Sequence, residues 1–232
     1  MSSHRKPRSS PFNGRAVRTV LLAAGAAGVA TAVPAHAATG PARSAAVVSD
    51  GVYANANRLH HTQARDSFTI RQFDEVDATS VRNQARAVSM GCSVDDHCRS
   101  VALSFQIITV AGDAHHLKAV NVGNAANTYC DGCQTLAGAY QFVVSTPHPL
   151  TLDAGARRRL ADVHRRLDAL TRSTLPATEL RERVDALAGE VSGVLQAAVA
   201  KTPKTSGASK ASGGTEKPGV TLHRRLDGWP GH

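Results

Sequence analysis

The clearest pattern in this chain is a strict alternation of large and small side chains. From Val101 to Ile107, large apolar residues occupy every second position and small or polar residues stand between them. The same alternation returns between Leu136 and Val144. A period of two is typical of a strand with two different faces. We therefore predict two strands, each with a small face that lets another layer pack closely; Gly138 interrupts one large face and indicates a bulge or a close approach.

The two strands belong to an internal repeat that also contains all four cysteines. The spacing of the copies differs by three residues, all within the first loop between cysteines. The matched positions are Cys92 with Cys130, Asn83 with Asn121, Ala87 with Ala125, Cys98 with Cys133, and residues 99–108 with 134–143. Matched cysteines at both edges argue against chance. Two copies of one supersecondary unit are the better interpretation.

Each copy is predicted to be a hairpin that runs strand, cysteine, turn, cysteine, strand. Asp131-Gly132 between two strands is a strong hairpin signal, because both central positions of such a turn need a positive φ. Residues 67–76 are expected to form a further strand, with Phe68 and Ile70 on one face. The predicted fold of residues 66–150 is a small antiparallel β-sheet or sandwich built from two repeated hairpins.

Residues 151–200 carry two helical patterns. Asp153 is placed to cap a helix that ends near Arg172, and Pro176 opens a second helix. Apolar residues then recur at steps of three and four: Leu160, Val163, Leu167 and Leu170, then Leu180, Val184, Leu187, Val191, Val194 and Ala198. This spacing predicts an antiparallel helical hairpin or short coiled coil. The expected fold class is therefore α+β.

Composition divides the chain into six segments. A basic start, the apolar run Thr19–Val33 and Ala35-His36-Ala37 together have the order of a secretory signal peptide with its cleavage site. The predicted segments are 1–37 signal peptide, 38–65 flexible lead-in, 66–150 cysteine-bearing β repeat domain, 151–200 helical hairpin, 201–219 disordered linker and 220–232 Trp-bearing tail. The expected location is secreted, extracellular or cell envelope.

Charge excludes one class of partner. The formal net charge is +9, but five basic residues and no acidic residue lie in segment 1–37, which leaves +4 for the remainder. That balance does not predict a nucleic-acid-binding protein. Arg157-Arg158-Arg159 and Arg165-Arg166 are either a patch for an anionic surface or, as we prefer, a solvated face balanced by Asp162 and Asp168. The apolar runs are too short to predict a membrane span.

The cysteines leave three interpretations open. An even number in an exported chain first indicates disulfides, which we expect to join Cys92 to Cys98 and Cys130 to Cys133 at the hairpin tips. Neighbouring tips could instead be cross-linked to each other. Four thiolates at those tips also resemble a zinc ribbon, and Cys130-x-x-Cys133 has the spacing of a redox motif.

Catalytic signatures are sparse. The chain contains no Gly-x-Ser-x-Gly, phosphate loop or dinucleotide fingerprint after the leader. The candidate metal ligands are Asp113 and five histidines: His60, His61, His97, His115 and His116. Adjacent histidines in a strand point to opposite faces, so one pair is a poor metal site. We predict no catalytic residue, no metal ligand and no cofactor.

Several motifs carry a resemblance to a known group of proteins. They are Asn-x-Ala-x-Ala before a cysteine pair, Cys98-Arg-Ser-Val-Ala-x-x-Phe-Gln-Ile, and Asn121 through Cys130-x-x-Cys133 to Ala-x-Ala-Tyr-Gln-Phe-Val-Val. Residues 66–200 thus resemble exported bacterial proteins with a twofold cysteine-pair repeat followed by a helical pair. Some members are labelled peptide zinc metalloproteases. This chain has a wider first cysteine loop and lacks His-Glu-x-x-His, so no catalytic residue is carried over.

The function expected from these patterns is that of a secreted, non-catalytic binding module whose partner is unknown. The sheet face, the helical seam and the tail are the predicted contact surfaces, and the seam also offers self-association. In the tail, Leu222, Leu226 and Trp229 are expected to dock either onto the sheet or onto another protein. The alternative is a metal- or thiol-dependent extracellular enzyme, or an accessory to a peptide metalloprotease.

Overall fold

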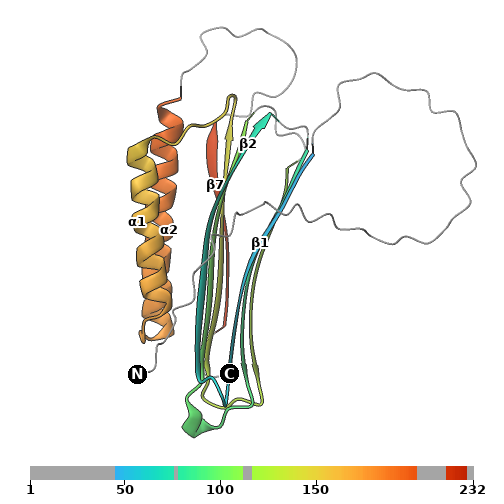
Figure 1. Cartoon of the computed structure of the whole chain (residues 1–232), viewed down its shortest axis with the longest axis vertical. Helices are drawn as coiled ribbons and strands as arrows, with labels where there is room; N and C mark the ends of the chain where they lie inside the picture. Colours follow the sequence, from blue (N-terminus) through green and yellow to red (C-terminus); the bar gives the residue numbers. More distant parts are fainter. Residues whose placement is uncertain (1–44, 76–77, 112–116, 203–217, 229–232) are drawn as a thin grey trace, which may run out of the picture. The chain divides into compact units, whose positions relative to one another are not determined.

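The computed structural model describes residues 45–75, 78–111, 117–202 and 218–228 (Figure 1). These residues belong to one compact unit, Pro41–His232. The predicted signal peptide, the cluster of Asp113, His115 and His116, and Trp229 lie outside the described residues.

Seven strands and two α-helices of the described residues form three layers. The elements are β1 (Ala45–Asn57), β2 (Thr62–Glu75), β3 (Ala78–Met90), the 3-10 turn η1 (Val94–Asp96), β4 (Arg99–Ala111), β5 (Leu117–Thr128), β6 (Gln134–Thr146), α1 (Ala154–Thr171), α2 (Ala177–Ala200) and β7 (Gly219–Asp227). The outer sheet has the order β1-β3-β5, and the central sheet has the order β2-β4-β6-β7. The helices contact the central sheet alone, so the central sheet lies between them and the outer sheet (Figure 1).

Successive strands form arches that join the two sheets. β1, β3 and β5 run parallel, as do β2, β4 and β6, while β7 joins β6 antiparallel. The α+β class is confirmed, but the antiparallel sheet of two hairpins is wrong. Asp131-Gly132 turns the chain between sheets, and of these two residues only Gly132 has a positive φ, of 72°. Alternation and a glycine turn are common to hairpins and arches, so the pattern alone did not separate them.

The internal repeat is confirmed at single-residue register. Asn83 pairs with Asn121 in the outer sheet, and residues 99–108 pair with 134–143 in the central sheet. In a parallel stack, each residue lies on its equivalent in the next copy and shares its environment. The similarity between the copies therefore reflects stacking of like on like.

A third copy of the arch precedes the two that carry cysteines. β1 and β2 stack in register on β3 and β4, which places Asp50 beside Asn83. Within residues 38–65, expected to be a flexible lead-in, positions 45–65 form β1, its arch and the start of β2. This copy lacks cysteines and replaces the asparagine of its neighbours by aspartate, so it is hard to recognise from the sequence.

The two faces of the central sheet pack as the alternation predicts. Its large side chains, including Phe105, Tyr140 and Phe142, form the main core with both helices. Its small face, including Ala102 and Ala137, packs on alanines of the outer sheet. The small residues thus serve a close approach of two sheets.

The helical seam is buried inside the protein. The predicted seam positions from Leu160 to Ala198 belong to the main core, and Leu170 packs against it partly buried. Asp153 caps α1 by accepting a hydrogen bond of 2.6 Å from the Ala156 amide. Neither helix in the described part of the chain is long and apolar enough to cross a membrane. The seam is therefore covered by the protein's own central sheet.

The tail completes the central sheet. β7 pairs with β6, with Leu226 opposite Gly138 and Leu222 opposite Phe142. A Cβ on Gly138 would lie 2.9 Å from both Leu226 Cδ2 and Leu103 Cδ2, so this glycine marks a close approach. Residues 220–227 of the predicted tail, together with Gly219 of the predicted linker, therefore pair with the central sheet.

Candidate functional site

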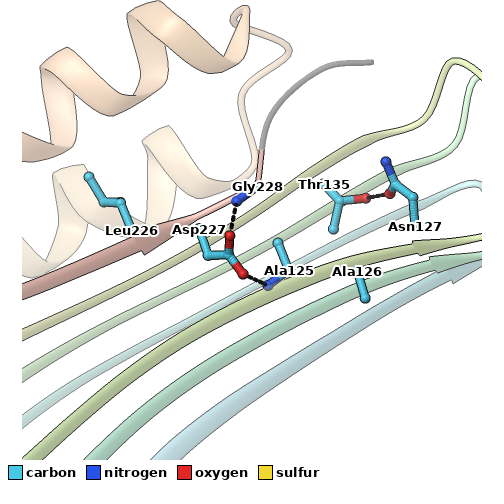
Figure 2. Close-up of a pocket in the computed structure, with 7 residues that line it drawn as sticks. All are labelled: Ala125, Ala126, Asn127, Thr135, Leu226, Asp227 and Gly228. Atoms are coloured by element: carbon cyan, nitrogen blue, oxygen red, sulfur yellow. Dashed lines mark hydrogen bonds between the residues drawn. The ribbon is translucent and has the colours of Figure 1, made fainter. Parts of the chain in front are cut away.

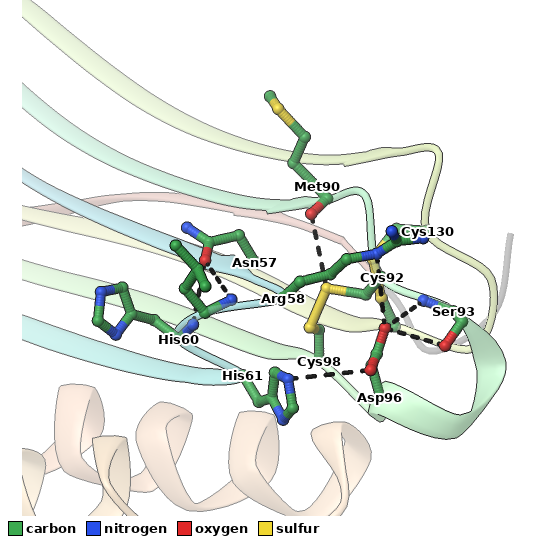
Figure 3. Close-up of polar contacts among 12 residues, drawn as sticks. Asn57, Arg58, His60, His61, Met90, Cys92, Ser93, Asp96, Cys98 and Cys130 are labelled. Atoms are coloured by element: carbon green, nitrogen blue, oxygen red, sulfur yellow. Dashed lines mark hydrogen bonds and ion pairs between the residues drawn. A yellow bond between two sulfur atoms is a disulfide. The ribbon is translucent and has the colours of Figure 1, made fainter.

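All three arches lie at the same end of the stack, because their strands are parallel and in register. We call this surface, formed by residues 57–61, 90–98 and 128–133, the arch end (Figure 3). It brings together the four cysteines and three of the histidines that the sequence singles out. It is consequently the densest collection of potentially functional side chains among the described residues.

Two local disulfides close the second and third arches. Cys92 is bonded to Cys98 with 6.2 Å between Cα atoms, and Cys130 to Cys133 with 5.8 Å. These are the predicted pairs, rather than a cross-link between neighbouring tips. Both disulfides are buried against Ala56 of the first arch. The stacked arches are thus covalently closed and share a small apolar core.

The same cysteines are the candidate ligands in the zinc alternative. The Sγ atoms of Cys92, Cys130 and Cys133 lie within 4.8 Å of one another, and Cys98 belongs to the same buried cluster. Thiolates so placed would fit a sulfur-ligated zinc ion. A sulfur atom in a disulfide lacks the negative charge of a thiolate. Zinc binding therefore requires that both disulfides are first reduced.

Asp96 links the first two arches. Its Oδ2 accepts hydrogen bonds from the amide and hydroxyl of Ser93, at 2.7 and 2.9 Å. Arg58 Nε and His61 Nε2 of the first arch each lie 3.9 Å from the carboxylate (Figure 3). The Ser93 hydrogen bonds, backbone first, and then the nearby His61 and Arg58 hold the pKa of Asp96 below its usual value. An ionised Asp96 therefore ties the arches together.

Several exposed apolar side chains lie at the arch end. Tyr129 is 91 % exposed and Leu59 is 87 % exposed, and Met90 and Val94 are about half exposed or more. Leu59, Met90 and Tyr129 line one open hollow of about 500 Å³ together with Asn57, Arg58 and Gly91. Such a cluster is a common mark of an interaction site.

Local backbone structure holds these side chains outward. The Asn57 side chain accepts hydrogen bonds from the amides of Leu59 and His60, at 2.9 and 3.0 Å, which fixes a tight turn. Tyr129 has φ of 49°, a left-handed conformation that is unusual for an aromatic residue. Strained residues of this kind cluster at functional sites.

A second hollow, of about 360 Å³, lies where β5 and β7 end and β6 begins (Figure 2). Asp227 accepts hydrogen bonds from the amides of Ala125 and Gly228, at 2.8 and 2.9 Å. Leu226 and Thr135 complete its wall. Of the predicted tail site, Leu226 lies here, Leu222 lies farther along β7, and Trp229 falls outside the described residues.

The structure brings together part of the predicted site and adds residues that sequence reasoning missed. The cysteines meet at the arch end, whereas the tail leucines lie on β7. Leu59, Met90 and Tyr129 were not singled out, because each is a lone apolar residue in its own segment. Their clustering appears only when the first, cysteine-free arch is aligned with the other two.

Comparison with known proteins adds no assignment. No family model, curated protein or solved structure matches this chain. The resemblance to exported bacterial proteins therefore remains an expectation from the sequence motifs. Function has to be argued from the residues of this chain.

Proposed function

We propose that this chain is an exported, non-catalytic interaction module that binds a protein partner through its arch end. The observation that carries the proposal is the exposed apolar cluster of Leu59, Met90 and Tyr129 around one hollow. Tyrosine, methionine and arginine are enriched at protein interfaces, and Arg58 stands in the same wall. A protruding apolar or aromatic side chain of a partner would suit this hollow.

The arch end is built to lose little entropy on binding. Two arches are closed by disulfides, and Asp96 joins the second arch to the first. A surface ordered before binding loses less conformational freedom when the complex forms. The rigid arches therefore support binding by a preformed surface.

Export is supported by the redox chemistry of the cysteines. Stable disulfides are typical of secreted and extracellular proteins and rare in the cytosol. The signal-peptide pattern of residues 1–37 points the same way. We therefore place the interaction outside the cytoplasm, as a secreted or envelope protein.

Site-specific photo-cross-linking tests the proposed docking surface. A photoreactive phenylalanine analogue replaces Tyr129 in the intact chain, and in a matched protein it replaces Leu222 on β7. Both proteins are illuminated with the envelope and secreted fractions of the source cells. The proposal expects one defined protein adduct from position 129 and none of that size from position 222.

Matched double substitutions complete the test. Leu59→Ser with Tyr129→Ser should abolish recovery of the partner, whereas Ile70→Ser with Leu222→Ser removes two apolar side chains elsewhere and should leave it intact. Thermal unfolding verifies that all variants are folded. Equal recovery by both pairs, or an absence of adducts at position 129, would refute an arch-end partner.

A second candidate is thiol-dependent zinc binding, favoured by the three Sγ atoms that lie within 4.8 Å. Alkylation of the native protein followed by metal analysis separates the two candidates. The interaction module predicts no reactive thiol before unfolding and reduction. Four reactive thiols with one equivalent of zinc would instead favour the metal protein, and with it the metal-dependent alternative.

A further inference from the structure

We propose that the outward face of the outer sheet is a second binding surface, which takes an anionic polysaccharide. This face consists of the side chains of β1, β3 and β5 that point away from the central sheet. It differs from the arch end in position and in chemistry. The inference therefore goes beyond the protein-binding function and does not depend on it.

Nothing in the described part of the chain covers this face. The helices contact only the strands of the central sheet. Arg82 and Arg86 are exposed on β3, and Lys118 and Asn124 are exposed on β5. Tyr53 on β1 is 53 % exposed. The large face of the central sheet is buried by contrast, because both helices pack on it. The outer sheet therefore offers a wide strand surface to solvent.

The charge of the face has one sign. The only acidic residue in β1, β3 and β5 is Asp50, and its side chain is turned inward to Thr69 and Gln106. Among the residues that the structure describes, Arg82, Arg86 and Lys118 thus lie on a surface without a carboxylate.

In the described part of the chain, these cations also lack acidic partners. Arg82 donates to the Gln84 amide oxygen at 3.3 Å, and the Arg86 guanidinium lies 5.9 Å from the centre of the Tyr53 ring. Among described residues, Arg82, Arg86 and Lys118 form no ion pair. Several arginines of the helices do pair with acids, such as Arg165 with Asp162. The unpaired cations of the outer sheet remain available to an anion.

The spacing of the cations favours a polymer over a small ion. Arg82 and Arg86 are four residues apart on β3, which corresponds to about 13 Å along a strand. Lys118 pairs with Ser80, a further two residues away, so the three cations extend over about 20 Å. A single small anion cannot contact all three. An extended chain with a charge on successive units can.

The remaining side chains fit a sugar. The Tyr53 ring lies in the same register row as Arg86 and Asn124, with Gln84 one outward position before Arg86 on β3. An exposed ring can stack on the apolar face of a pyranose, and amides donate and accept hydrogen bonds with hydroxyl groups. The planar guanidinium group of arginine forms paired hydrogen bonds with a carboxylate. Together these groups match a carboxylated polysaccharide.

Binding measurements on the full chain without its leader use polygalacturonate as the probe and dextran as its uncharged counterpart. The proposal expects binding to polygalacturonate that weakens with added salt, and much weaker binding to dextran. Arg82→Gln with Arg86→Gln should weaken polygalacturonate binding about tenfold or more, because charge-assisted hydrogen bonds are lost. Arg158→Gln with Arg159→Gln removes the same charge from α1 and should change the affinity less than about twofold.

Two further measurements test the role of the ring and the nature of the ligand. Tyr53→Thr keeps every charge and should weaken binding about threefold if the ring stacks on the sugar. Vesicles of phosphatidylglycerol test an anionic membrane as the alternative ligand. Equal weakening by the two arginine pairs, no effect of Tyr53→Thr, tighter binding to vesicles, or no polygalacturonate binding would overturn the proposal. The Tyr129 adduct of the arch end should be unaffected by Arg82→Gln with Arg86→Gln, so the two proposals fail separately.

Discussion

Asp50 shows at the scale of a single residue how a stack of repeats ends. Asn83 donates to Asn121 at 3.0 Å, and in the first copy the same position is Asp50. Its carboxylate accepts hydrogen bonds of 2.8 Å from both Thr69 and Gln106. Burial opposes ionisation of Asp50, but hydrogen bonds from Gln106, Thr69 and Arg71 and the charge of Arg71 outweigh it and lower its pKa. A carboxylate thus replaces the amide in the first copy, before which the described residues contain no further copy.

Replacing this carboxylate should destabilise the protein. Asp50→Ala removes the charged acceptor of Thr69 and one of the two acceptors of the buried Gln106 amide, which keeps the Arg82 carbonyl oxygen, and should lower the free energy of unfolding by about 2 to 3 kcal/mol. Asp50→Asn retains one acceptor oxygen and should cost less. Because the folded pKa is lowered, the ionised Asp50 contributes stability above its unfolded pKa of about 3.9, and that contribution disappears as the pH falls through the folded pKa. Urea titrations at several pH values measure both effects; a cost below about 0.5 kcal/mol for Asp50→Ala contradicts the assigned role.

Asp66 should show the opposite dependence on pH. Burial, and then the neighbouring carboxyl of Asp168, raise the pKa of Asp66, although His164 Nε2 lies 3.4 Å away. A raised folded pKa means that protonated Asp66 stabilises the fold at pH values below the unfolded pKa. That contribution is lost as the pH rises through the folded pKa. The stability of Asp66→Asn relative to the natural protein should therefore increase as the pH rises from about 4 and then level off.

The matched control for Asp66 is Asp162→Asn. Asp162 lies on the exposed face of α1 and pairs with Arg165. Urea unfolding of both variants across the same pH range isolates the effect of the Asp66–Asp168 interaction. A relative stability of Asp66→Asn that falls with rising pH would show that the Asp66–Asp168 interaction is misassigned.

At the scale of elements, the sequence reveals the strands more readily than their partners. The alternation around Phe105 and Tyr140 predicts both the strands and their two faces. The aligned cysteine pairs match residues 99–108 with 134–143 as equivalent positions, and these residues pair in the structure. The direction of pairing could not be derived, because residues flanking a Cys-x-x-Cys turn alternate alike in a hairpin and in an arch. The small residues were the signal that could have indicated an arch. On both sides of each cysteine pair the strand has a small face, and these faces belong to two sheets that pack on each other.

The tail strand is the element whose contribution is easiest to measure. Leu226 is partly buried against the main core, whereas Leu222 is 38 % exposed. Leu226→Ala should lower the free energy of unfolding by about 1 to 2 kcal/mol, less than a fully buried leucine would. Leu222→Ala, the matched control, should cost less than about 0.5 kcal/mol. Thermal and urea unfolding provide the comparison, and equal costs would contradict the docking of β7 that brings Leu226 onto the core.

At the scale of the whole molecule, parallel stacking separates three surfaces. It gathers the arches at one end, turns the large face of the central sheet to the helices, and exposes the outer sheet (Figure 1). The sequence predicts the disulfides of the arch end but not its apolar hollow, since Leu59, Met90 and Tyr129 come from three different copies. Neither proposed binding surface exists in a single repeat. Both depend on the parallel register of the stack.

An engineered cross-link within the outer sheet tests that register most directly. Gln84 and Val122 are opposite each other on parallel β3 and β5, and both point away from the central sheet. Gln84→Cys with Val122→Cys should form a disulfide under mild oxidation, because neighbouring strands lie about 4.8 Å apart. Gln84→Cys with Asn124→Cys, shifted by two residues, should remain largely unlinked. Peptide mapping that finds the shifted pair linked and the opposed pair unlinked would contradict the parallel stack.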